Sequence, residues 1–75
     1  MEHGILVAEA RSGSTDDYDA YQIIATVASL QEAYRFAKSN VNLELSQFPG
    51  VFVERFILHT QDDNGFYTKR QLIKV

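Results

Sequence analysis

Histidines and aspartates are the side chains of this chain that could bind a metal or transfer protons, and their spacing argues against both roles. No third ligand follows His3 or His59 at a spacing typical of zinc sites. Asp16, Asp17 and Asp19 cluster in one stretch, but they lack the regular Asp-x-Asp-x-Asn-Gly spacing of a calcium-binding loop. We therefore expect no bound metal, and we interpret the aspartates as a solvated acidic loop that could meet a basic partner.

Nucleophile and phosphate-binding motifs are also missing. The stretch Ser12-Gly13-Ser14-Thr15 has neither the lysine nor the second glycine of a Walker motif. No Gly-x-Ser-x-Gly turn presents a serine nucleophile. A small sheet with one helix seldom forms the desolvated pocket that paired catalytic carboxylates need. We expect a protein that is not an enzyme, with no cofactor and no small-molecule substrate.

Length and composition limit the remaining classes. The chain has 75 residues, a formal charge of −3, 45 % hydrophobic residues and no cysteine. We expect one small domain over residues 1–75, and the lack of cysteine suits a cytoplasmic protein. The longest apolar stretch, 4–8, is too short to span a bilayer, and we see no signal peptide. So short a chain buries only about 60 % of the surface of its unfolded form, so without disulfides it needs near-ideal local structure, a partner or a second copy.

Hydrophobic patterning predicts two strands and then a helix. Residues 4–10 and 20–27 are short apolar runs typical of strands, and the Gly-, Ser- and Asp-rich residues 11–19 between them predict a loop. Ser29 and Glu32 fit a capping box at the start of a helix. The apolar stripe of that helix consists of Leu30, Ala33, Tyr34, Ala37 and Val41.

The last third of the chain predicts a β-hairpin. Residues 51–61 and 66–75 are strand-like, and Asn64-Gly65 between them is the strongest short-range hairpin signal, typical of a two-residue type I′ loop. This loop sets the register. The resulting pairs are Phe56 with Ile73, Ile57 with Leu72, His59 with Arg70 and Arg55 with Lys74. We therefore predict an α+β fold of order ββαββ, with a four-stranded, mostly antiparallel sheet and one helix packed on one face; the strand order stays open.

Side-chain alternation divides this hairpin into two faces. We assign one face to the core beneath the helix: Phe52, Phe56, Leu58, Tyr67, Ile73 and Val75. A single helix cannot cover both faces, so the other should be open: Val51, Val53, Arg55, Ile57, His59, Phe66, Thr68, Arg70, Leu72 and Lys74. Like charges opposite one another on this second face require a counter-charge, and the apolar residues among them would mark a contact site.

These features predict a small binding module that acts through protein–protein contacts, with a protein partner or as a homodimer. The expected partner-binding residues are Arg55, His59, Phe66, Arg70 and Lys74 on the open face, with Asp16, Asp17 and Asp19 in the acidic loop.

Two alternatives stay open. The element order resembles that of some small anti-CRISPR proteins, in architecture alone and without a shared motif. The resemblance implies a phage or mobile-element accessory protein, a viral protein that inhibits a host nucleic-acid machine. The open face could instead bind nucleic acid directly. The net acidity of the chain, and Phe66 as the single aromatic residue expected on that face, argue against this.

Overall fold

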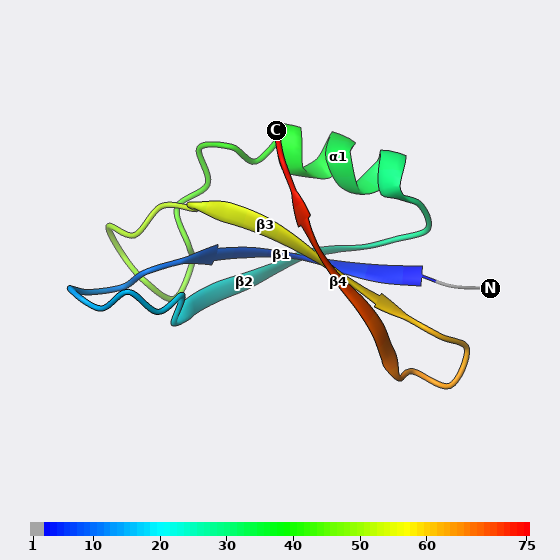
Figure 1. Ribbon diagram of the computed structural model, residues 1–75. Coiled ribbons are helices and arrows are strands. Elements are labelled where there is room, and N and C mark those ends of the chain that lie inside the picture. The colour runs from blue at the N-terminus through cyan, green and yellow to red at the C-terminus, as the bar shows by residue number, and fades with distance from the viewer. Residues whose placement is uncertain (1–2) are drawn as a thin grey trace.

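The computed structural model describes residues 3–75, which form a four-stranded antiparallel sheet and one helix in the order ββαββ (Figure 1). The predicted fold class is confirmed. The elements are β1 (His3–Ala10), β2 (Ala20–Val27), α1 (Leu30–Lys38), β3 (Arg55–Gln61) and β4 (Tyr67–Ile73).

The strands lie in the order β2-β1-β3-β4, and every neighbouring pair is antiparallel. Two hairpins, β1–β2 and β3–β4, are thus joined along their first strands. In the central pair, Leu6 lies opposite Leu58 and Val7 opposite Ile57, and all four side chains are buried. The two central strands therefore carry apolar side chains on both faces of the sheet, which is typical of interior strands.

The helix begins at the predicted capping box. The Glu32 N–H donates to Ser29 Oγ at 3.1 Å, and the Ala28 N–H donates to the Glu32 carboxylate at 3.3 Å. The box therefore satisfies the N–H of the residue before the N-cap, Ala28, rather than that of Ser29 itself. These bonds fix where the chain leaves β2 and turns over the sheet.

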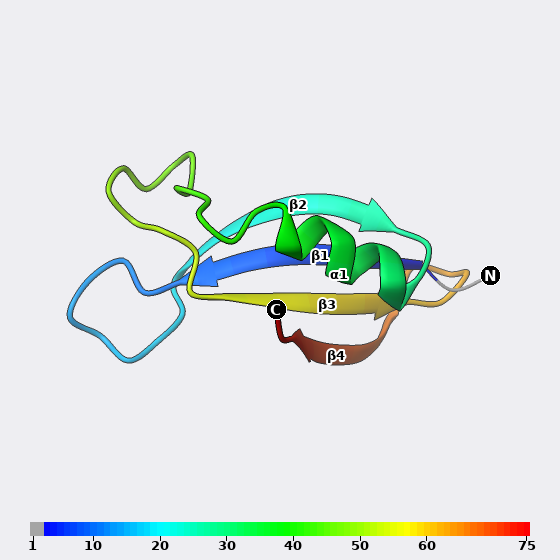
Figure 2. The same cartoon turned by 90° about the horizontal axis from the view of Figure 1, so that it is seen from above.

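Small residues bring α1 close to the sheet. Ala33 and Ala37 are fully buried, whereas Leu30, Tyr34 and Val41 of the predicted stripe stay exposed. Figure 2 shows α1 above the central strands, with β4 outside its cover. The larger side chains of the stripe therefore lie beside the core instead of inside it.

The segment 39–54 between α1 and β3 completes the core. Leu45 is buried, and Val51 and Val53 pack against the core cluster, so our assignment of these two valines to the open face was wrong. Phe52, which we assigned to the core, is exposed. Strand alternation fails here because β3 begins only at Arg55, and Phe52 belongs to an isolated bridge with Glu44.

The core cluster combines side chains from all five elements and from the segment before β3. Its members are Leu6, Ala8, Ala10, Ala20, Val27, Ala33, Ala37, Leu45, Phe56, Leu58 and Ile73.

The β3–β4 hairpin forms with a different turn from the predicted one. Gly65 has φ +84°, but Asn64 does not have positive φ, which excludes a type I′ loop. The Gly65 N–H donates to the Asp62 carbonyl and the Asp62 N–H to the Phe66 carbonyl, each at 3.0 Å. This pattern is a three-residue loop with glycine in the left-handed conformation.

A bulge then restores the predicted register. Gln61 lies opposite Tyr67, and Thr60 lies opposite Lys69, so Thr68 is an extra residue in β4. Beyond it, the predicted pairs are confirmed for Phe56 with Ile73, Ile57 with Leu72 and His59 with Arg70. The predicted pair of Arg55 with Lys74 is not formed, because β4 ends at Ile73.

The bulge also changes the face of one aromatic residue. Tyr67 shares its face with Gln61 and His59 instead of with the core, which corrects our assignment. Val75, also assigned to the core, follows the end of β4 and is exposed.

Candidate functional site

The sheet face turned away from α1 is exposed, and we call it the open face. Cross-strand partners share a face, so the register defines its members. They are His3, Ile5, Val7, Glu9, Tyr21, Ile23, Thr26, Arg55, Ile57, His59, Gln61, Tyr67, Arg70 and Leu72.

The open face contains a shallow hollow of about 730 Å³. Ile5 and Val7 from the central strand β1 line its floor. Tyr21 and Ile23 line it from the β2 edge and are 63 % and 59 % exposed, and Tyr67 lines it from the β4 edge with 64 % exposure. Large apolar and aromatic side chains thus edge an apolar floor, as is typical of contact surfaces. Polar and charged side chains complete the lining: Glu9, His59, Thr68, Lys69 and Arg70.

The charges of the open face are paired within the chain. The Arg55 guanidinium donates to Glu9 Oε1 at 2.8 Å, and Arg70 lies 3.4 Å from the same oxygen. The Glu9 side chain is only 14 % exposed. Glu9 of the chain itself therefore supplies the counter-charge that we expected Arg55 and Arg70 to require. The strand order places Glu9 of β1 directly opposite Arg55 of β3.

The loop 11–19 packs against one end of the open face through Tyr18. The Arg55 guanidinium lies 3.5 Å from the centre of the Tyr18 ring, and the Arg11 guanidinium lies 4.9 Å from it. Both distances are within the range of cation–π contacts. Tyr18 therefore links the loop to the charged end of the sheet.

Hydrogen bonds fix both ends of this loop. Arg11 donates to Glu54 through its backbone N–H at 2.7 Å and through its side chain. These bonds lower the pKa of the Glu54 carboxyl and raise the pKa of the Arg11 guanidinium. Ser12 donates to Asp19 through its N–H at 2.8 Å and its hydroxyl at 2.7 Å, which lowers the pKa of the Asp19 carboxyl.

The structure brings together three of the predicted partner-binding residues. Arg55, His59 and Arg70 lie on the open face, where the His59 ring contacts the Tyr67 ring edge-on at 5.5 Å. Phe66 lies at the hairpin turn with 70 % exposure, and Lys74 lies beyond the end of β4.

Of the three predicted acidic residues, two are exposed and one forms hydrogen bonds within the loop. Asp16 and Asp17 are exposed in the loop, so they remain available to a partner. Asp19 instead accepts the Ser12 hydrogen bonds that hold the loop in shape.

Sequence reasoning missed several residues of the open face. Alternation along residues 4–10 and 20–27 could have found Ile5, Glu9, Tyr21 and Ile23, since they point away from buried neighbours. Tyr67 could not be found in this way, because a bulge shifts its face.

Among residues 3–75, no three His, Cys, Asp or Glu side chains are arranged to hold a metal ion. In the same range, no helix is long and apolar enough to cross a membrane. No model of a known protein family matches the sequence, and no curated protein or solved structure is significantly similar to it. The function is therefore argued from the geometry of this chain.

Proposed function

We propose that this chain is a non-enzymatic binding module that contacts another protein through the open face of its sheet. The observation that carries the proposal is the apolar hollow, edged by exposed Tyr21, Ile23 and Tyr67. Burial of this exposed apolar surface against a partner would lower the free energy and so favour binding. Aromatic residues are enriched at such interfaces.

Charge and aromatic placement favour a protein partner over nucleic acid. The Glu9 carboxylate pairs with both Arg55 and Arg70, so these arginines are not free to neutralise phosphates. Sheets that bind single-stranded RNA stack bases on aromatic side chains. Here the central strands present Ile5, Val7 and Ile57 on that face together with the ring of His59, and the two tyrosines lie on the edge strands.

A pair of aromatic-to-serine variants tests the proposal. Tyr67→Ser removes an exposed ring from the open face, and Phe52→Ser removes one of similar exposure elsewhere. The tagged wild-type chain and both variants would be used to capture proteins from the native lysate after nuclease treatment, with quantitative mass spectrometry. We expect a protein that the wild type and Phe52→Ser retain, and that Tyr67→Ser recovers about tenfold less.

Two results would contradict the proposal. One is capture of the same proteins in equal amounts by all three chains. The other is recovery only of material that disappears after nuclease treatment, which would favour nucleic acid.

Self-association is a second candidate, supported by the β2 edge. β2 (AYQIIATV) has no charged residue and no proline, whereas the other edge strand, β4, carries Lys69 and Arg70. Charged side chains on edge strands normally prevent pairing between copies. The β2 edge lacks this protection and has only a bulge near Ile24. A second copy pairing along β2 would therefore meet no charge repulsion.

Lysine substitutions on the two edges test this candidate. If copies pair along β2, Ile23→Lys should make the protein monomeric in sedimentation equilibrium, and Leu72→Lys on β4 should leave association unchanged. A wild-type chain that stays monomeric at high concentration, or loss of association in Leu72→Lys alone, would rule out pairing along β2.

A further inference from the structure

The helix side of the sheet is wider than the helix that covers it. A helix with its side chains is about 10–12 Å across and strands lie about 4.8 Å apart, so one helix covers about two strands of four. Segment 39–54 covers part of the β2 side, where the Ser46 N–H donates to the Gln22 side chain at 2.8 Å and Leu45 is buried. β4 lies outside the cover of α1 in Figure 2; on its helix side Lys69 is exposed and Gln71 half-buried, and Ile73 at its end is buried in the core.

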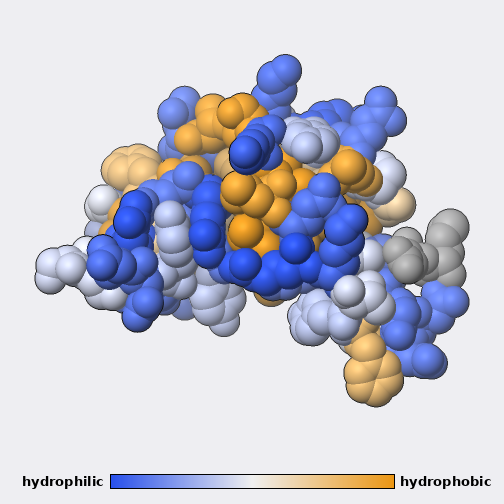
Figure 3. Space-filling view, in the orientation of Figure 1, coloured by the Kyte–Doolittle hydropathy of each residue, from blue (hydrophilic) through white to orange (hydrophobic). Residues whose placement is uncertain are grey.

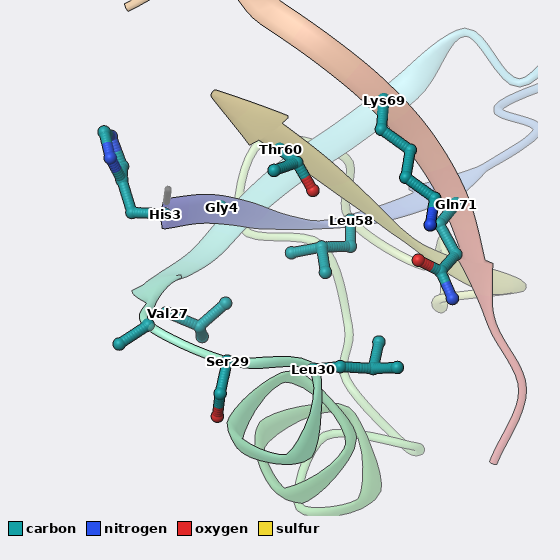
Figure 4. Close-up of a pocket in the computed structure, with 10 residues that line it drawn as sticks. His3, Gly4, Val27, Ser29, Leu30, Leu58, Thr60, Lys69 and Gln71 are labelled. Carbon is teal, nitrogen blue, oxygen red and sulfur yellow. The ribbon is translucent and has the colours of Figure 1, made fainter. Parts of the chain in front are cut away.

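An apolar groove, here called the α1–β4 groove, results. Leu30 and Tyr34 are exposed one turn apart on the same flank of α1, and Val41 is exposed beyond the end of the helix. Figure 4 shows Leu30 directed towards β4, with the buried Leu58 behind it. Hollows of about 230 Å³ and 430 Å³ lie towards its two ends. In Figure 3, hydrophobic surface gathers between α1 and β4 with hydrophilic residues around it.

Two of the three lysines border this groove. Lys69 lines the hollow near the start of α1, and Lys74 lines the hollow at the other end. Lys38 lies on the outer side of α1 with Gln31 and Arg35. All three lie in the described part of the chain, and none of them forms an ion pair there. The four arginines do form ion pairs: Arg11 with Glu54, Arg35 with Glu32, and both Arg55 and Arg70 with Glu9.

We propose that the α1–β4 groove binds an acidic amphipathic helix of a partner protein. A helix has the width to cover the strand beside α1, and its apolar stripe would pack on the exposed Leu30, Tyr34 and Val41. Carboxylates beside that stripe would pair with Lys69 and Lys74, in a chain whose net charge of −3 otherwise repels acidic partners. The groove borders the open face at Lys69, and the proposal does not depend on the function proposed for that face.

A pair of synthetic peptides tests the charge preference. One is an amphipathic helix of about 16 residues with leucines at helical spacing and glutamates beside them; the other has lysine in place of every glutamate. Each would be titrated into the purified chain while the backbone amide signals are followed by NMR. We expect the acidic peptide to shift the signals of Leu30, Tyr34 and Gln71, and the basic peptide to leave them unchanged.

Two double variants with the same net charge test the lysines. Lys69→Gln with Lys74→Gln removes two positive charges from the groove. Ser14→Glu with Gln47→Glu changes the net charge by the same amount at exposed positions away from it. We expect the first variant to weaken binding of the acidic peptide about fivefold, as for two exposed ion pairs, and the second to leave it unchanged.

Several results would overturn the proposal. Equal binding of both peptides, equal weakening by both double variants, or shifts confined to the open face would each exclude the groove as an acidic-helix site. Failure of the acidic peptide to bind, with groove signals that shift on adding an oligonucleotide or anionic vesicles, would assign the lysines to another ligand. Groove signals that move on dilution of the chain alone would assign the groove to a second copy. The capture experiment with Tyr67→Ser is independent of all these outcomes.

Discussion

At the residue scale, Glu9 determines whether the open face is stable, because it balances two arginines. Glu9→Gln would leave Arg55 and Arg70 close together without a counter-charge, on a partly buried surface. We expect the free energy of unfolding to fall by about 1–2 kcal/mol in urea denaturation, within the range for a lost charged hydrogen bond. Asp16→Asn, at an exposed loop position, should leave it unchanged. Equal stability of wild type and Glu9→Gln would show that the two ion pairs contribute nothing.

The carboxyls of Glu54 and Asp19 make the free energy of unfolding depend on pH. Their hydrogen bonds lower both pKa values below the ordinary 4.5 and 3.8. A lowered pKa in the folded state stabilises the fold fully above the ordinary value, and this stabilisation is lost as the pH falls through the folded-state pKa.

We therefore expect the free energy of unfolding to fall on acidification below about pH 4.5, the ordinary Glu value, and to fall less in the double variant Glu54→Gln with Asp19→Asn. Urea denaturation from about pH 6 to about pH 3 measures this. An identical pH dependence in wild type and variant would mean that these two carboxyls do not contribute.

At the element scale, substitutions in the β3–β4 turn distinguish the three-residue loop of the structure from the type I′ loop that the sequence predicts. Both loops need glycine at position 65. Gly65 has φ +84° and Asn64 does not have positive φ. Gly65→Ala should therefore destabilise the fold by about 1 kcal/mol, since alanine resists that conformation. Asn64→Ala should have little effect, because the Asn64 backbone suits any residue. Thermal unfolding of both variants measures the difference. A large loss in Asn64→Ala would favour the type I′ loop that the sequence predicts.

The same hairpin shows what a sequence pattern can and cannot predict. Asn64-Gly65 correctly indicated a hairpin and the pairs from His59 with Arg70 to Phe56 with Ile73. This register was predicted from a two-residue type I′ loop, which the structure does not contain between residues 61 and 67. The actual loop shifts the register by one residue, and the Thr68 bulge shifts it back. Alternation has no means of detecting a bulge, so Tyr67 was assigned to the core.

At the scale of the whole molecule, the order of the strands in the sheet determines contacts that the sequence pattern could not predict. The strands, the capped helix and the open face follow from local patterns. The contact of Glu9 with Arg55 joins residues 46 positions apart and exists because β1 lies beside β3. Local patterns do not choose between arrangements of two hairpins, so the arginines appeared uncompensated. The burial of Val51 and Val53 was missed because the chain before β3 folds back as a loop.

The two proposed surfaces lie on opposite faces of one sheet, which predicts that they are occupied independently. The open face is turned away from α1, whereas the α1–β4 groove lies beside it (Figure 1). A core of close-packed side chains separates most of the two surfaces, which share residues only where they meet: Lys69 lines the open-face hollow as well as the groove, and Arg55 and Leu72 line one end of the groove. We expect Tyr67→Ser to reduce capture of the open-face partner without changing the affinity for the acidic peptide. Lys74→Gln, which changes a lysine that lines the groove and not the open-face hollow, should do the reverse. Native mass spectrometry of the chain with both ligands should detect a ternary complex. Mutually exclusive binding would mean that the two ligands share one surface, or that the sheet changes shape when either binds.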